Sequence, residues 1–262
     1  MAPAPQRSSI DQFSETAANY AISKPHNQGE SLGLVSAFIS KGGRRFGTAV
    51  DIATGPGFTA FAAAPHAERV LATDPTRPML NQVRLIRDER GLGNVDLVIV
   101  IAEQLPFADG SLDLLTCRTA PHHFLDVTRW LGEVARVLAP GGVFVLCDTT
   151  APEDPAVGAW MNDLEVRRDP SHVRNWTPTE WAAGVEVAGL NITDRGMAKV
   201  LLDYEDWVSR SATPPDVAAG IAADLREASA AVRASFGIEI GSGSRIDWHW
   251  PVVVLRAEKP RA

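Results

Sequence analysis

The sequence predicts an α/β protein built on a doubly wound, mostly parallel sheet of seven strands with a helical lid. Apolar runs alternate with amphipathic segments from about residue 47 to residue 150. The runs are hydrophobic almost throughout, which is typical of strands covered on both faces. The first run passes into a turn, Thr54-Gly55-Pro56-Gly57, that opens an alanine-rich helix. Such alternation places the strands parallel and joins them by right-handed crossovers.

This part of the chain contains five expected strands and three expected helices. The helices lie near 57–65, 77–90 and 126–138. Gly91 follows the second helix as a C-terminal cap, and a Pro-Gly-Gly turn at 140–142 follows the third. The expected strands are 48–53, 69–74, 95–101, 112–118 and 142–148.

The segments outside this core are less regular. Residues 8–40 have a helical pattern ahead of the first strand. A capping box, Thr177-Pro178-Thr179-Glu180, starts a helix that ends near Gly189. The remaining expected elements are a sixth strand at 191–202, a helix from Thr213 to about Phe236 and a seventh strand at 248–257.

These elements divide the chain into four parts. They are a helical lead-in (1–40), a core (41–202), a helical insertion (203–245) and a final strand of the core sheet (246–262). The lead-in and the insertion are not needed to complete the sheet. We therefore expect both to fold as a lid over its carboxyl edge, where doubly wound folds place their ligand sites.

Composition excludes several classes of protein. The net charge is −7 and Lys and Arg form no cluster, so neither nucleic acid nor an anionic membrane is an expected partner. No apolar run approaches the roughly 18 residues of a membrane span, and the N-terminus lacks a signal-peptide core. Cys117 and Cys147 lie in strand-like segments without metal-ligand spacing. We expect a reduced, cytoplasmic protein with no metal site.

Two ligand classes fit a strand that ends in a glycine turn, namely dinucleotides and S-adenosylmethionine. Glycine lets a ligand lie against bare backbone. The dinucleotide pattern needs a third glycine, and position 60 is alanine. Asp74, at the end of the second strand, can accept ribose hydroxyls in either class. The discriminating features are Asp51 inside the first strand, AEQLPF at 102–107 and VLAPGG at 137–142.

In that combination the chain resembles the class I S-adenosylmethionine-dependent methyltransferases, and in particular the small-molecule branch that includes the ubiquinone/menaquinone-biosynthesis enzymes. The resemblance covers most of the chain and implies a Rossmann-like, cofactor-binding core. Its motifs are DIATGPG (51–57), LATDPTRPML (71–80), AEQLPFADGSLDLL (102–115) and RVLAPGGVFVL (136–146). The lead-in pattern Tyr20-x-x-Ser23-x-x-His26-x-x-Gly29-Glu30 is also similar.

By this resemblance, S-adenosyl-L-methionine binds along the ends of the first four strands. Asp51 would anchor the methionine end and Asp74 the ribose hydroxyls, while Met79 would pack on the adenine. Where relatives often have Asp or Thr before the Ala-Glu pair, this chain has Ile101, so adenine recognition rests on backbone groups. The other implied cofactor-binding residues are Tyr20, Ala53, Gly55, Gly57, Ala102, Glu103, Cys117 and Arg118.

Methyl transfer needs alignment of the acceptor and, for an oxygen or carbon nucleophile, a base. His122 and His123 follow the fourth strand at the carboxyl edge, and His172 could approach the same place. At most one of the two adjacent histidines is expected to face the substrate, and both could simply pack in their loop. His26, Trp176 and Trp207 are the candidates for lining the substrate pocket, and its aromatic character favours a small apolar or aromatic substrate.

The resemblance leaves other functions open. The same fold can hold S-adenosylmethionine and run a non-methylating reaction such as a cyclisation, because function belongs to the site. A module that binds the cofactor without catalysis is a further alternative. An NAD(P)-dependent oxidoreductase is disfavoured by Ala60 and by Asp51, which would have no task there. The sequence names no methyl acceptor and leaves a homodimer open.

Overall fold

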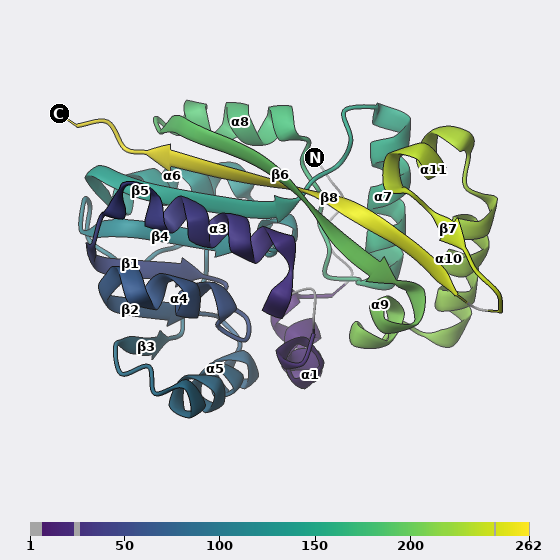
Figure 1. The fold of residues 1–262 in the computed structure, drawn as a ribbon, viewed down its shortest axis with the longest axis horizontal. Coiled ribbons are helices and arrows are strands. Elements are labelled where there is room, and N and C mark those ends of the chain that lie inside the picture. The colour runs from purple at the N-terminus through teal and green to yellow at the C-terminus, as the bar shows by residue number, and fades with distance from the viewer. Residues whose placement is uncertain (1–6, 24–26, 244, 262) are drawn as a thin grey trace.

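A mostly parallel sheet forms the centre of the protein, as predicted (Figure 1). The computed structural model describes residues 7–23, 27–243 and 245–261. The strand order is β3-β2-β1-β4-β5-β8-β6, and the short β7 pairs with β8. Only β8 is antiparallel to its neighbours β5 and β6, since the pairs from β3 to β5 are parallel. The strands are β1 (Phe46–Ile52), β2 (Ala67–Thr73), β3 (Val95–Val98), β4 (Leu112–Arg118), β5 (Leu138–Thr149), β6 (Asn191–Asp203), β7 (Glu239–Ile240) and β8 (Ile246–Glu258).

Helices cover both faces of the sheet. Those described are α1 (Ser9–Ala21), α3 (Glu30–Ser40), α4 (Phe58–Ala63), α5 (Arg77–Arg90), α6 (Val127–Val137), α7 (Pro155–Arg168), α8 (Pro178–Val187), α9 (Tyr204–Arg210), α10 (Pro215–Glu227) and α11 (Ala230–Phe236). Apolar residues of α3, α4 and α5 form one core with the sheet, and those of α6 and α8 form a second core. The fold is therefore doubly wound.

A third core lies where β6 and β8 run on beyond the rest of the sheet. Figure 1 shows α7, α9, α10 and α11 gathered around this long two-stranded ribbon. Trp207, Trp248 and Trp250 are almost wholly buried there, together with Phe236 of α11. The helical insertion expected at 203–245 thus forms an apolar core together with α7 and the ribbon, separate from the two cores of the main sheet.

The structure differs from the sequence predictions in several boundaries. There are eight strands among the described residues instead of seven, because the two-residue β7 pairs with β8. β3 ends at Val98, and Ile101 beyond it makes only an isolated bridge to Gln104. The single helix expected up to Phe236 is two helices, because Ser229 caps a new one by accepting a hydrogen bond from the Val232 N–H at 3.3 Å.

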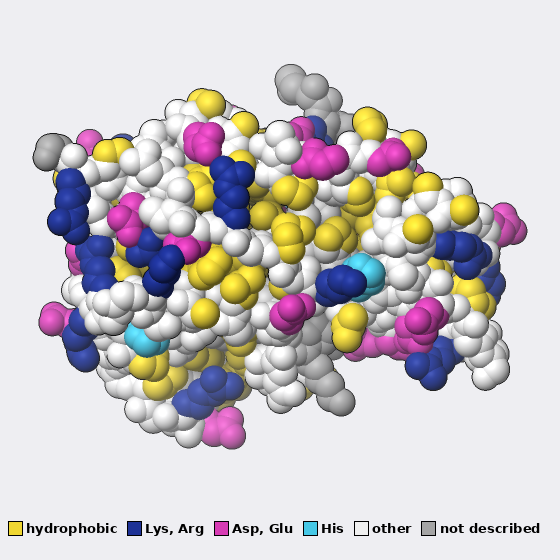
Figure 2. Space-filling view, turned by 45° about the horizontal axis from the view of Figure 1, so that its top comes forward, with side chains coloured by type: hydrophobic (Ala, Val, Ile, Leu, Met, Phe, Trp, Pro, Cys, Tyr) yellow, Lys and Arg dark blue, Asp and Glu magenta, His cyan; other side chains and the backbone are white. Residues whose placement is uncertain are grey.

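The surface carries charges of both signs. On the face shown in Figure 2, basic and acidic side chains are interspersed, and apolar side chains gather near its middle. Over the described ranges, the helices are all too short or too polar to cross a membrane.

Candidate functional site

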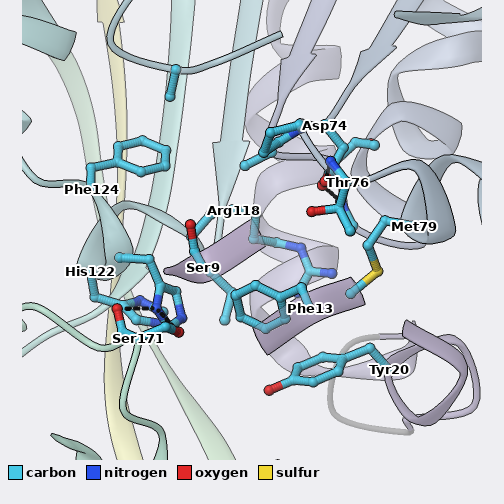
Figure 3. Close-up of a pocket in the computed structure, with 18 of the residues that line it drawn as sticks. Ser9, Phe13, Tyr20, Asp74, Thr76, Met79, Arg118, His122, Phe124 and Ser171 are labelled. Carbon is cyan, nitrogen blue, oxygen red and sulfur yellow. Dashed lines mark hydrogen bonds between the residues drawn. The ribbon is translucent and has the colours of Figure 1, made fainter. Parts of the chain in front are cut away.

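A cavity of about 590 Å³ lies at the carboxyl ends of β1, β2 and β4. Figure 3 shows Asp74, Thr76 and Met79 on one side of it, with His122 and Ser171 on the other. Phe13 of α1 lies between these two groups. One continuous cavity therefore joins the glycine turn to the predicted histidines. It is lined, among the site residues predicted from sequence, by Tyr20, Ala53, Gly55, Asp74, Met79, Ala102, Glu103, Arg118, His122, His123 and Trp207.

The glycine turn presents bare backbone to this cavity. Gly55 has a φ of +53°, and a Cβ added to it would meet no atom within 4 Å. Ala53 also has a positive φ, of 49°, which is unusual for a residue with a side chain. Gly57 is different, because its Cβ would come within 2.7 Å of the Phe61 ring. Gly57 therefore permits the packing of α4 and does not line the cavity.

The Asp51 carboxylate lies behind the turn, outside the cavity wall. It accepts hydrogen bonds from the hydroxyls of Thr54 at 2.5 Å and Thr116 at 2.6 Å. Burial raises the pKa of Asp51 to about 6, which these two hydrogen bonds partly oppose. In the structure Asp51 holds Thr54, and with it the turn, and does not line the cavity. Its direct contact with the cofactor, which the resemblance implies, stays a prediction.

Asp74 lies in the cavity wall. Its two oxygens accept hydrogen bonds from the backbone N–H groups of Gly55 at 3.0 Å and Thr76 at 2.8 Å. Burial raises the pKa of Asp74 to about 6. A carboxylate has about four lone-pair sites, so Asp74 can still accept from a ligand hydroxyl. Glu103, further along the wall, accepts from the Leu125 N–H at 3.1 Å.

The remaining predicted cofactor residues take different positions. Cys117 is fully buried in the sheet and does not line the cavity. Arg118 does line it, and its Nε donates to the Thr59 hydroxyl at 2.9 Å. Tyr20 reaches the cavity from α1 and packs edge-on against Phe13. His26 lies outside the described residues.

Three histidines meet on the other side of the cavity. The ring of His122 lies 4.3 Å from that of His123 and 5.3 Å from that of His172. The His122 Nδ1 lies 2.7 Å from Oδ1 of Asp148, a carboxylate with no solvent exposure at the end of β5. Burial disfavours a charged imidazole, but the charge of Asp148 and this hydrogen bond prevail, so the pKa of His122 is raised.

The other two histidines are held neutral. Burial and the neighbouring His122 lower the pKa of His123 to about 3, and the same two causes lower that of His172 well below its ordinary value. His123 Nδ1 lies 3.1 Å from the Ser171 carbonyl, to which it donates as a neutral ring. His172 is bonded to Asn162 and lies outside the cavity lining. His122 is thus the histidine of this group arranged to take up a proton.

The two tryptophans proposed to line the substrate pocket lie in different places. Trp207 on α9 is buried and lines the cavity. Trp176 packs against Trp181, with ring centres 4.9 Å apart, in the core beneath α8.

Sequence reasoning missed Asp148, Arg210 and Trp250. In the portion of the chain that the structure describes, no His, Cys, Asp and Glu side chains form a group suited to a metal ion.

A doubly wound sheet with antiparallel β8, a glycine turn after β1 and a buried acidic residue after β2 is the architecture of S-adenosylmethionine-dependent methyltransferases. The family model of the methyltransferase domain matches residues 50–146. YcgJ of Bacillus subtilis, an uncharacterised methyltransferase, is 36% identical over 248 residues, covering 94% of this chain and 97% of that protein. The chain therefore belongs to the class I S-adenosylmethionine-dependent methyltransferases.

Solved structures and shorter matches agree with this assignment. The crystal structure of YcgJ has a TM-score of 0.81 with 35% identity, over 88% of this chain and 99% of that one. A demethylmenaquinone methyltransferase of Thermus thermophilus is 39% identical over 112 residues, which cover 42% of this chain and 50% of that protein. The cyclase SpnF, with a TM-score of 0.67 and 17% identity over 100% of this chain and 99% of that one, shares the fold.

Proposed function

We propose that the protein transfers a methyl group from S-adenosylmethionine to an oxygen or carbon atom of a small apolar or aromatic molecule. The observation that carries this proposal is the single cavity that joins Gly55 and Asp74 to the His122–Asp148 pair. Its volume, about 590 Å³, is in the usual range for small-molecule sites. Trp207 and Trp250 line it, which suits an apolar or aromatic acceptor.

The first half of the cavity fits the cofactor. The open space above Gly55 leaves room for a ligand against the backbone, and Asp74 offers carboxylate lone pairs for ribose hydroxyls. Met79 and Ala102 offer an apolar surface for adenine, and Arg118 offers a cation for the methionine carboxylate. When bound, S-adenosylmethionine supplies an electrophilic methyl group on a positively charged sulfur.

His122 is the proposed general base. Its Nδ1–H is directed to Asp148, which leaves the Nε2 lone pair to take a proton from the acceptor. The backbone N–H of His122 also donates to Asp148, at 2.9 Å, so the ring and its main chain are held by one buried carboxylate. The acceptor would then carry the electron pair that a methyl group from bound S-adenosylmethionine would alkylate, with S-adenosylhomocysteine as the other product.

Labelled cofactor and a panel of hydroxylated aromatic molecules test this proposal. We expect S-adenosylhomocysteine and a methylated product in equal amounts, and a rate lower by about 10²–10⁴-fold in His122→Gln. His66→Gln, in which a histidine outside the cavity lining is changed, is the matched control. Conversion of an acceptor without consumption of the cofactor would instead support the non-methylating alternative.

A further inference from the structure

The cavity lining contains two buried arginines that the proposed chemistry does not use. Arg168, the last residue of α7, and Arg210, the last residue of α9, both line the cavity. They are only 8% and 5% exposed. Arginine is rarely this deeply buried unless its donors have partners. A guanidinium that lacks partners among the described residues is therefore a candidate for binding a ligand in the cavity.

Each guanidinium nitrogen of Arg168 has a hydrogen-bond partner within the protein. Its Nε donates to the Trp207 carbonyl at 3.1 Å, and its Nη1 donates to the buried Glu165 carboxylate at 3.1 Å. Its Nη2 lies 3.4 Å from the Tyr20 hydroxyl, and the guanidinium lies over the Trp207 ring. Arg168 and Glu165 thus form a buried ion pair in the cavity lining, in which Oε2 of Glu165 is the acceptor.

Arg210 is less completely paired. Its Nη1 donates to the Ser23 hydroxyl at 3.0 Å and to Asp206 at 2.7 Å, but the Asp206 side chain is 56% exposed. Its Nε is buried without a hydrogen-bond partner. Burial and the nearby Arg168 lower the pKa of Arg210, as expected for a desolvated cation beside another cation.

A second unpaired donor lies in the same wall. Trp250 of β8 lines the cavity, and its indole Nε1 is buried without a partner. Within the described lining, Arg210 and Trp250 are the residues with such orphaned side-chain atoms, and both atoms are N–H donors. A buried donor without a hydrogen bond carries a desolvation penalty, which is larger for a charged group. These two N–H groups of the cavity lining therefore lack an acceptor within the described residues.

We propose that the methyl acceptor is an apolar or aromatic molecule carrying a carboxylate, and that Arg210 binds this carboxylate with the Trp250 N–H as a second donor. The walls around the two residues, which include Val200, Leu202 and Trp207, fit an apolar body. His122 then faces the other part of the same molecule, where the methyl group is placed. This inference rests on the proposed function, since it assigns the substrate of that same site.

Titration calorimetry with two probe ligands tests the inference. Cinnamate and cinnamamide have the same aromatic body, and only the first carries a carboxylate. With enzyme saturated by S-adenosylhomocysteine, we expect cinnamate to bind at least about tenfold more tightly than the amide. In Arg210→Gln this preference should disappear. Equal affinity of the two probes for the unmodified enzyme, or a preference that survives in Arg210→Gln, would overturn the inference.

Two tryptophan variants keep the test decisive if Arg210→Gln does not fold. Trp250→Phe removes the cavity N–H and should weaken cinnamate binding several-fold, with little effect on cinnamamide. Trp248→Phe removes an equally buried and unpaired N–H outside the cavity lining and should leave both affinities unchanged. An equal effect of the two variants would refute the role of Trp250. Failure of S-adenosylhomocysteine itself to bind would instead refute the proposed function.

Discussion

Replacing Gly55 by valine should strongly weaken cofactor binding without unfolding the protein. A Cβ at this position would project into open cavity space, so valine places its methyl groups where the ligand is proposed to lie. The turn cannot shift away freely, because the Gly55 N–H donates to Asp74 at 3.0 Å. Overpacking costs about 1–3 kcal/mol and the lost hydrogen bond about 1 kcal/mol. Their sum corresponds to an affinity lower by about 30- to 1,000-fold.

Gly43→Val is the matched control for this experiment. Gly43 has a similar φ, of +63°, and equally open space around it, but it is exposed and lies outside the cavity lining. Valine in this backbone region costs about 1–2 kcal/mol at either site, and each kcal/mol lowers Tm by about 2–4 °C. The two variants should therefore have a similar Tm, whereas calorimetry should show a much lower affinity for S-adenosylhomocysteine in Gly55→Val than in Gly43→Val. Unchanged affinity in Gly55→Val, or equal losses in both, would refute the reasoning.

Three further predictions concern the cavity walls and their cover. Affinity for S-adenosylhomocysteine should fall below about pH 6, because burial raises the pKa of Asp74 to about 6 and this carboxylate accepts hydrogen bonds best when ionised. Calorimetry should show weaker binding in Asp74→Asn, with an affinity that depends less on pH. The rate should rise with pH through a pKa above the ordinary histidine value, since His122 acts when neutral. In Asp148→Asn this pKa should move to lower pH and kcat should fall, which a pH–rate profile checks. Deleting residues 1–30 should lower turnover far more than Tm, because α1 reaches the cavity through a small cluster of Phe13, Ala17, Tyr20 and Met79; full activity of the truncated chain would contradict the lid hypothesis.

Hydrogen exchange extends this last prediction and revises one part of it. We expect exchange in α1 to slow when cofactor and acceptor bind. The insertion at 203–245 is the other part of the expected lid, but α9, α10 and α11 bury a core against α7 and the β6–β8 ribbon. Exchange there should therefore change less than in α1. A larger change in this segment than in α1 would contradict the revised expectation.

The features that could be predicted from sequence have local causes. The five parallel strands are continuous apolar runs, and the glycine turn follows from its own residues. The capping box at Thr177 is present as predicted, with the Thr177 hydroxyl accepting from the Glu180 N–H and the Glu180 carboxylate accepting from the Thr177 N–H. Each of these signals acts within a few residues, so no knowledge of tertiary packing is needed.

The features that could not be predicted depend on contacts between distant segments. Nothing near Asp148 in the sequence marks it as the partner of His122, which lies 26 residues earlier and meets it only because β4 and β5 are neighbours. A strand-end acidic residue beside a predicted histidine loop is the one signal that could have suggested it. Arg210 and Trp250 reach the cavity from α9 and β8, and Trp176 turns into the core, for equally long-range reasons.

The central claim is that this cavity binds S-adenosylmethionine, and titration calorimetry of the unmodified protein tests it most directly. S-adenosylmethionine and S-adenosylhomocysteine should each bind at one site per chain and compete with each other. NADH and ATP should neither bind nor displace them, because the chain lacks the third glycine of the dinucleotide pattern. Absence of heat with both sulfur nucleosides, together with saturable binding of NADH, would contradict the account.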